Sequence, residues 1–209
     1  MSTPWSEAGS DATLPSPKPK GYGEEIFSLL HYIADTVPMK EGTNLQELRV
    51  VFREAADYLM GRMGGVHEDF PKAVQSLAEV AKQKPLLRRE AVGAISTFYN
   101  ELPADADKFA DRAARETLME FLKDTDPSVR LAATEGLEKA AVWTVLDPSS
   151  SYRGSSGRKT DKEKFAEALS AALEAEQDPQ VSTAVRDVID LMQKTELTRL
   201  RQLSPVLKR

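Results

Sequence analysis

The stretch Asp-Pro-Ser-Val-Arg-Leu-Ala-Ala-Thr-Glu-Gly-Leu, residues 126–137, decides the fold of this chain. Its proline stands at a helix start, where the missing amide proton costs little because that group would lack a partner anyway. Val129, Ala133 and Leu137 then follow one another at intervals of four residues. This spacing places them on one side of a helix and predicts an amphipathic helix that continues to Leu146.

The same pattern returns elsewhere in the chain. A shift of 42 residues toward the N-terminus lays Pro127 on Pro85 and Leu137 on Ile95. A shift of 52 residues toward the C-terminus lays Pro127 on Pro179. A looser match lies 81 residues before the anchor stretch. Repeats of about 40 residues are typical of stacked helix pairs, so four such pairs are predicted.

The rest of the chain carries helical spacing as well. Apolar residues recur every three or four positions, and no alternating strand pattern of useful length appears. The fold is therefore predicted to be all-α. The predicted helices cover, in chain order, residues 24–38, 45–59, 66–83, 85–102, 105–123, 127–146, 161–176 and 179–194.

The repeated turn resembles that of the HEAT-repeat family, in which Asp-Pro-x-Val-Arg often joins two helices. The resemblance covers residues 24–194 and implies a short, right-handed, armadillo-like α-solenoid of about four helix pairs. Asp124 and Arg130 match the acidic and basic positions that help to tie the family's units together. Lys82 replaces the acid in one other unit and Ser182 replaces the base in another, so a continuous charge ladder is not predicted.

Three segments differ from the repeats in composition. Residues 1–23 contain four prolines and few apolar side chains, which predicts a disordered arm. Residues 24–195 form the predicted helical domain, with an inserted Ser/Gly-rich loop at 147–160. Residues 196–209 form a basic amphipathic tail, which would dock a partner, an anionic membrane surface or the edge of the last repeat.

Composition excludes several kinds of chemistry. The 209 residues include no cysteine and two histidines. Thiolate and iron–sulfur sites are therefore excluded, and the ligands for an imidazole-rich metal site are too few. A formal net charge of -5 argues against nucleic acid as a partner. We expect no transmembrane segment, because no apolar run approaches the ~18–20 residues that a spanning helix needs. The lack of cysteine and of an export signal favours a cytoplasmic location.

Arginines at the starts of the second helices are the best candidates for binding another protein. A cation there is unfavourable, because the helix dipole prefers negative charge at its N-terminus. An outside partner is therefore predicted: Asp124 for Arg130, and a neighbouring helix or an acidic ligand for Arg88 and Arg89. With the inserted loop, the candidate partner-binding residues are Arg49, Arg88, Arg89, Arg130, Arg153 and Arg158.

No residue set in the sequence predicts catalysis, a bound cofactor or a metal. The pair His67-Glu68 stands alone, whereas HEAT-like hydroxylases use several such pairs to hold iron. Trp143 fits a packing role, and the carboxylates Glu135 and Glu138 have no spacing that marks a catalytic pair. The sequence favours a non-enzymatic scaffold that binds another protein on the concave face. The alternative is a HEAT-like enzyme or accessory, resembling DNA glycosylases or chromophore lyases, with a ligand pocket there.

Overall fold

The computed structural model describes residues 50, 70–101, 108–146 and 160–203, and all the regular structure in these residues is helical. This confirms the all-α prediction for the described part of the chain. The described helices are α3 (Phe70–Gln83), the 3-10 turn η2 (Pro85–Leu87), α4 (Arg88–Glu101), α5 (Lys108–Phe121), α6 (Pro127–Leu146), α7 (Asp161–Ala175) and α8 (Pro179–Leu203).

Several predicted features lie outside these residues. They are the arm at 1–23, the helices at 24–38 and 45–59 apart from residue 50, the loop at 147–159, and the last six residues. The largest difference within the described part is at α8, which continues nine residues past the predicted end at Lys194. The predicted boundary between domain and tail, at 195/196, therefore lies inside this helix.

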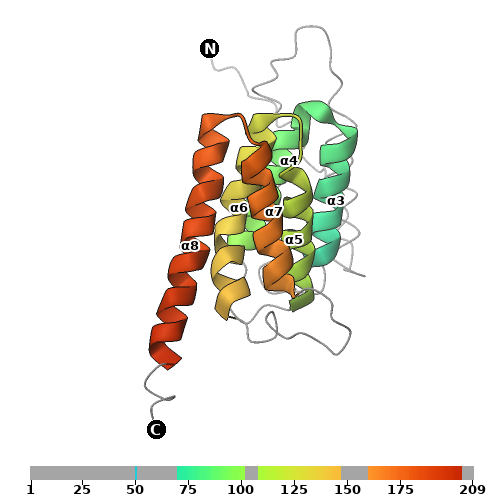
Figure 1. Ribbon diagram of the computed structural model, residues 1–209. Helices are drawn as coiled ribbons and strands as arrows, with labels where there is room; N and C mark the ends of the chain where they lie inside the picture. Colours follow the sequence, from blue (N-terminus) through green and yellow to red (C-terminus); the bar gives the residue numbers. More distant parts are fainter. Residues whose placement is uncertain (1–49, 51–69, 102–107, 147–159, 204–209) are drawn as a thin grey trace, which may run out of the picture.

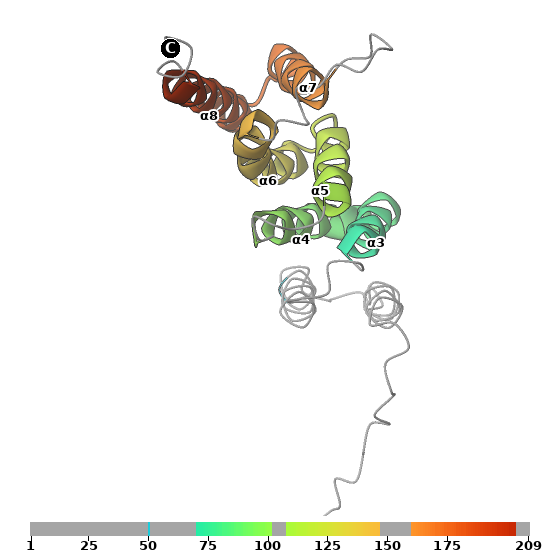
Figure 2. The same ribbon diagram turned by 90° about the horizontal axis from the view of Figure 1, so that it is seen from below.

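The six α-helices form two layers. Viewed from below in Figure 2, α3, α5 and α7 follow one another in one layer, and α4, α6 and α8 in the other. Each helix packs on the next member of its own layer, so α6 contacts both α4 and α8, and α5 contacts both α3 and α7. Consecutive helices also pack across the layers, as in α3 against α4 and α7 against α8.

The turns between paired helices explain why α6 and α8 begin where they do. Oδ1 of Asp126 accepts a hydrogen bond from the amide of Ser128 (2.8 Å), and Pro127 follows as the first helical residue. Oδ1 of Asp178 accepts from the amide of Gln180 in the same way (2.9 Å), before Pro179. Aspartate side chains satisfy amides that have no partner within the helix, and proline lacks the amide altogether. The Asp-Pro turn is thus the local cause of the starts of α6 and α8, whereas the unit of α4 keeps only the proline, after Lys84.

The core lies between the layers and includes a close contact where α4 meets α6. Ile95, Leu118 and Leu137 are fully buried there. The hydroxyl of Ser96 donates to the main-chain oxygen of Ala132 over 2.6 Å, which joins the two second helices directly. Gly136 permits this approach, because a Cβ at that position would lie 2.5 Å from Oγ of Ser96.

We expect the two glycines of α4 and α6 to respond to alanine in opposite directions. Gly136→Ala should lower the free energy of unfolding by about 1–3 kcal/mol, because the added methyl group overpacks the contact with Ser96. Gly93→Ala should raise it by about 0.5–1 kcal/mol, since nothing lies within 4 Å of the added Cβ and alanine favours the helix. Urea denaturation of both variants measures this; equal effects would contradict the close approach of α4 to α6.

Candidate functional site

Charged side chains connect neighbouring helix pairs along the edge where the turns between paired helices lie. Arg130, at the start of α6, donates to both carboxylate oxygens of Glu176 at the end of α7, over 2.7 Å from Nε and 2.6 Å from Nη2. Nη1 of Arg130 also donates to the main-chain oxygen of Asp124 over 2.8 Å. This paired, two-point geometry is the strong form of an arginine–carboxylate contact.

The carboxylate of Glu176 is held in its charged form. Its side chain is only 3% exposed, and the amide of Asp178 donates to it as well (2.8 Å). The hydrogen bonds from Arg130, followed by those from the main chain, lower the pKa of Glu176 to about 2, although burial acts in the opposite direction. The same contact raises the pKa of Arg130. Both groups are therefore fully charged at neutral pH.

A second contact of this kind joins the preceding pair of helices. Nη1 of Arg88 lies 3.4 Å from Oδ2 of Asp124, and Nε of Arg88 donates to the main-chain oxygen of Ala81 (3.0 Å). The two side chains are 25% and 11% exposed. This ion pair is therefore longer and more accessible to water than the one between Arg130 and Glu176. In each contact the base at the start of a second helix meets the acid that precedes the next second helix.

The pairing differs from the one that the sequence suggested. The carboxylate of Asp124 binds Arg88, and Arg130 reaches only the main-chain oxygen of Asp124. A signal for the true register was present in the sequence, because Glu176 lies 52 residues after Asp124, the shift that relates the two units. The predicted pair lies within one unit, whereas the fold pairs acid and base between neighbouring units.

The predicted partner-binding arginines have different surroundings. Arg88 and Arg130 are engaged by the neighbouring units, as described above. Arg89 is exposed, and within residues 70–101, 108–146 and 160–203 no ion pair of its side chain is found. Arg49, Arg153 and Arg158 lie outside the described residues, as does His67.

Trp143 is half-buried and takes part in a cation–π contact. The ammonium group of Lys139 lies 5.6 Å from the centre of the Trp143 ring and 6.0 Å from that of Tyr99. Lys139 also donates to the main-chain oxygen of Asn100, near the end of α4 (3.0 Å). These contacts link α4 to α6 and give Trp143 a packing role.

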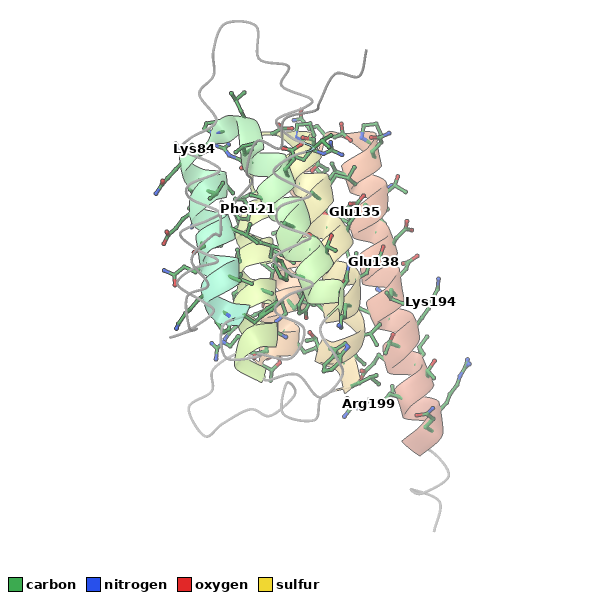
Figure 3. All side chains as sticks on the ribbon, turned by 180° about the vertical axis from the view of Figure 1, so that it is seen from behind. Lys84, Phe121, Glu135, Glu138, Lys194 and Arg199 are labelled. Carbon is green, nitrogen blue, oxygen red and sulfur yellow. The ribbon has the colours of Figure 1, made fainter. Side chains whose placement is uncertain are left out.

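The outward side of α4, α6 and α8, here called the second-helix face, carries exposed carboxylates. Glu135 and Glu138 project from α6 toward the viewer in Figure 3, one helical turn apart. Asp187 and Asp190 have the same spacing on α8, and the 52-residue shift lays them on Glu135 and Glu138. Among the described side chains, none pairs with any of these four carboxylates. The 52-residue repeat is the signal in the sequence that could have found this acidic band, because it places the carboxylates of α6 and α8 at equivalent positions of neighbouring units.

Two open hollows lie away from the middle of this face. One, of about 350 Å³, lies where α3 and α5 end and is lined by Lys82, Arg88, Glu120, Phe121, Lys123 and Asp124. The other, of about 390 Å³, lies between α6 and α8 and is lined by Leu146, Lys194, Thr195, Thr198, Arg199 and Gln202. Within the described residues, no group of three His, Asp or Glu side chains could hold a metal ion.

No protein-family model, curated protein or solved structure matches this sequence. The resemblance to HEAT repeats therefore rests on the repeated turn and on the residues that carry it. Over the part of the chain that the structure describes, none of the helices is both long and apolar enough to cross a membrane.

Proposed function

We propose that this chain is a non-enzymatic scaffold: a short, right-handed, HEAT-like α-solenoid of about four helix pairs that binds another protein on its second-helix face. The order of helices within each layer supports the solenoid, because every described helix packs on its counterpart in the neighbouring pair. A stack of this kind leaves one extended face to solvent, and such faces are used for binding macromolecules.

The observation that carries this proposal is the unneutralised acidic band on α6 and α8. Glu135, Glu138, Asp187 and Asp190 are all exposed, and no described cation pairs with them. Arg88 and Arg130 are meanwhile engaged within the chain, which reduces the positive charge available to an acidic ligand. Electrostatic complementarity therefore favours a basic segment of a partner protein.

The hollows also favour a scaffold over an enzyme. A site that binds a small ligand usually encloses most of its surface and places a few polar groups around it. Both hollows are open, and one of them is lined by side chains that already pair with one another, as in Arg88 with Asp124 and Lys82 with Glu120.

The test is a differential capture experiment with the full chain. Wild-type protein, Glu135→Gln/Glu138→Gln and the control Glu174→Gln/Glu167→Gln are immobilised, and the proteins recovered from a cell extract are identified by mass spectrometry. The control removes the same charge from exposed positions on α7. We expect basic proteins that bind the wild type and the control and that are lost from the α6 variant, with binding that weakens as salt increases.

Equal recovery by all three proteins would contradict the proposal. A further variant, Arg89→Glu, separates the acidic band from the arginine that the sequence singled out. Loss of partners with Arg89→Glu, but not with the α6 variant, would assign binding to the arginine and an acidic partner instead.

A further inference from the structure

The C-terminal end of α8 exposes leucines beside cations. Leu197 and Leu200 are 56% and 53% exposed and are two of the three large apolar side chains that are exposed in the described residues. Lys194 and Arg201 are exposed as well, on the same part of the helix. Among the described side chains, no carboxylate pairs with either cation. We call the surface formed by Lys194, Leu197, Leu200 and Arg201 the α8 tip.

The acid nearest to the tip in the chain is already paired. Glu196 is the only acidic residue between positions 191 and 203. Its carboxylate lies 2.9 Å from Nζ of Lys162 on α7 and 3.9 Å from Nη1 of Arg199. Arg199 also donates to the main-chain oxygen of Val145 over 3.0 Å, which fixes this side of α8 against the end of α6. The exposed charges of the tip are therefore all positive.

The tip lies beyond the acidic band on the same helix. Figure 1 shows that the C-terminal part of α8 projects past the ends of α6 and α7. Leu146, the last residue of α6, lines a hollow together with Lys194, so the tip begins where α6 ends. Asp187 and Asp190 come before this point, and the exposed cation Arg186 lies next to them in the chain. A flat surface that approaches the projecting end therefore meets the leucines and cations of the tip first.

These observations bear on the three roles that the sequence left open for the basic tail. A tail that capped its own last repeat would bury its leucines, whereas both are exposed. A partner groove that takes a helix usually holds apolar anchors over two turns, at i, i+3 or i+4 and i+7. Here the exposed residues four before and four after Leu197 are Gln193 and Arg201, so the apolar pair spans one turn. A lipid surface needs no longer series of anchors, because it contacts a helix on one side only.

We propose that the α8 tip binds the surface of an anionic lipid bilayer. Leu197 and Leu200 enter the boundary between headgroups and acyl chains, while Lys194 and Arg201 contact the anionic headgroups. Burial of apolar side chains and attraction of cations to anionic lipid are the two contributions that attach a helix in this way. Long lysine and arginine side chains keep their charge at the headgroups while the leucines lie deeper. This role uses none of the acidic band and does not depend on the proposed scaffold function.

The test is binding of the full chain to sucrose-loaded vesicles, measured by sedimentation. Wild-type protein should bind vesicles that contain phosphatidylserine, should be released as salt increases, and should bind pure phosphatidylcholine far less. Lys194→Glu/Arg201→Glu should weaken binding roughly twentyfold or more, since one cation at an anionic bilayer contributes a factor of about five. The control Lys72→Glu/Lys123→Glu makes the same change in net charge at exposed positions on α3 and after α5, and should weaken binding much less.

Leu197→Ser/Leu200→Ser tests the apolar contribution and should weaken binding about tenfold at unchanged charge. Three outcomes would overturn the proposal: a wild type that does not bind phosphatidylserine vesicles at low salt, a control that loses as much binding as the tip variant, or a serine variant that binds like the wild type. An acidic protein that binds the wild type but not Lys194→Glu/Arg201→Glu, with no binding to vesicles, would likewise overturn it and would assign the tip to a protein partner.

Discussion

Replacement of Arg130 by methionine should lower the free energy of unfolding by about 3–5 kcal/mol at pH 7. The variant keeps the length and much of the volume of the side chain but leaves the carboxylate of Glu176 without its main partner. That side chain is 3% exposed, so water cannot fully replace the guanidinium group. Loss of one partner of a buried ion pair is costly because the other charge stays buried. Guanidinium or urea denaturation measures the change.

Arg112→Met provides a matched control. Arg112 also pairs with a carboxylate, that of Glu116, but both side chains are more than half exposed and they lie one turn apart on α5. Exposed pairs of this kind contribute about 0.3–0.5 kcal/mol. Similar losses for the two variants would contradict a structural role for the contact between Arg130 and Glu176.

The effect of Arg130→Met should also depend on pH in a defined direction. The pKa of Glu176 is about 2 in the folded chain, below its ordinary value of 4.5. The contact therefore stabilises the fold fully above pH 4.5 and loses this contribution as the pH falls toward 2. The difference in stability between wild type and variant should be largest at neutral pH and should shrink below pH 4.5. A difference that stays constant down to pH 2 would show that the charge of Glu176 is not the cause.

Phe165→Ala should destabilise the chain by about 3–5 kcal/mol, because it removes a fully buried aromatic ring and leaves a cavity. The effect should be concentrated in α7, whose buried residues are Phe165 and Leu169. Hydrogen exchange should therefore accelerate across residues 161–175 well before global unfolding. Protection in α4 and α6 should change much less.

Leu146→Ala is the control for that experiment. Leu146 is 52% exposed, so its truncation should change stability by less than about 0.5 kcal/mol. If Phe165→Ala lowered the free energy of unfolding by no more than Leu146→Ala does, α7 would not be anchored by its buried ring as the structure describes.

The sequence predicted the helices well where local chemistry determines them. The predicted bounds of α6, 127–146, are the observed ones, because Asp126 and Pro127 define its start through groups close in the chain. The predicted start of α7 at Asp161 holds for the same reason. Thr160 and Glu163 form a reciprocal capping box that is complete within four residues.

The predicted end of α8 at Lys194 is wrong, because a change to basic composition does not break a helix. No glycine or proline occurs between Lys194 and Pro205, and the basic segment keeps helical spacing of its leucines. Both features favour continuation of the helix past Lys194. The change in charge signals which side chains face solvent and does not end the helix.

Contacts between units were the part that spacing within a single helix pair did not supply. Arg88 and Asp124 are 36 residues apart, and Arg130 and Glu176 are 46 apart, because each contact crosses to the next helix pair. The acidic band on α6 and α8 depends likewise on two helices that lie side by side only in the folded chain. Spacing along one helix contains no information about which neighbour it meets.

The most direct test of the stacked arrangement is a distance between α4 and α8. The chain has no cysteine, so Thr97→Cys and Asp187→Cys introduce the only two attachment sites for spin labels, both at exposed positions. Because α6 lies between these helices (Figure 2), the helix axes should be two packing steps apart, or about 16–20 Å. Double electron–electron resonance should give a single distance distribution consistent with that separation. Strong dipolar broadening of the continuous-wave spectrum, as expected for labels on helices one packing step or about 10 Å apart, would mean that the helices close into a bundle and would contradict the stack.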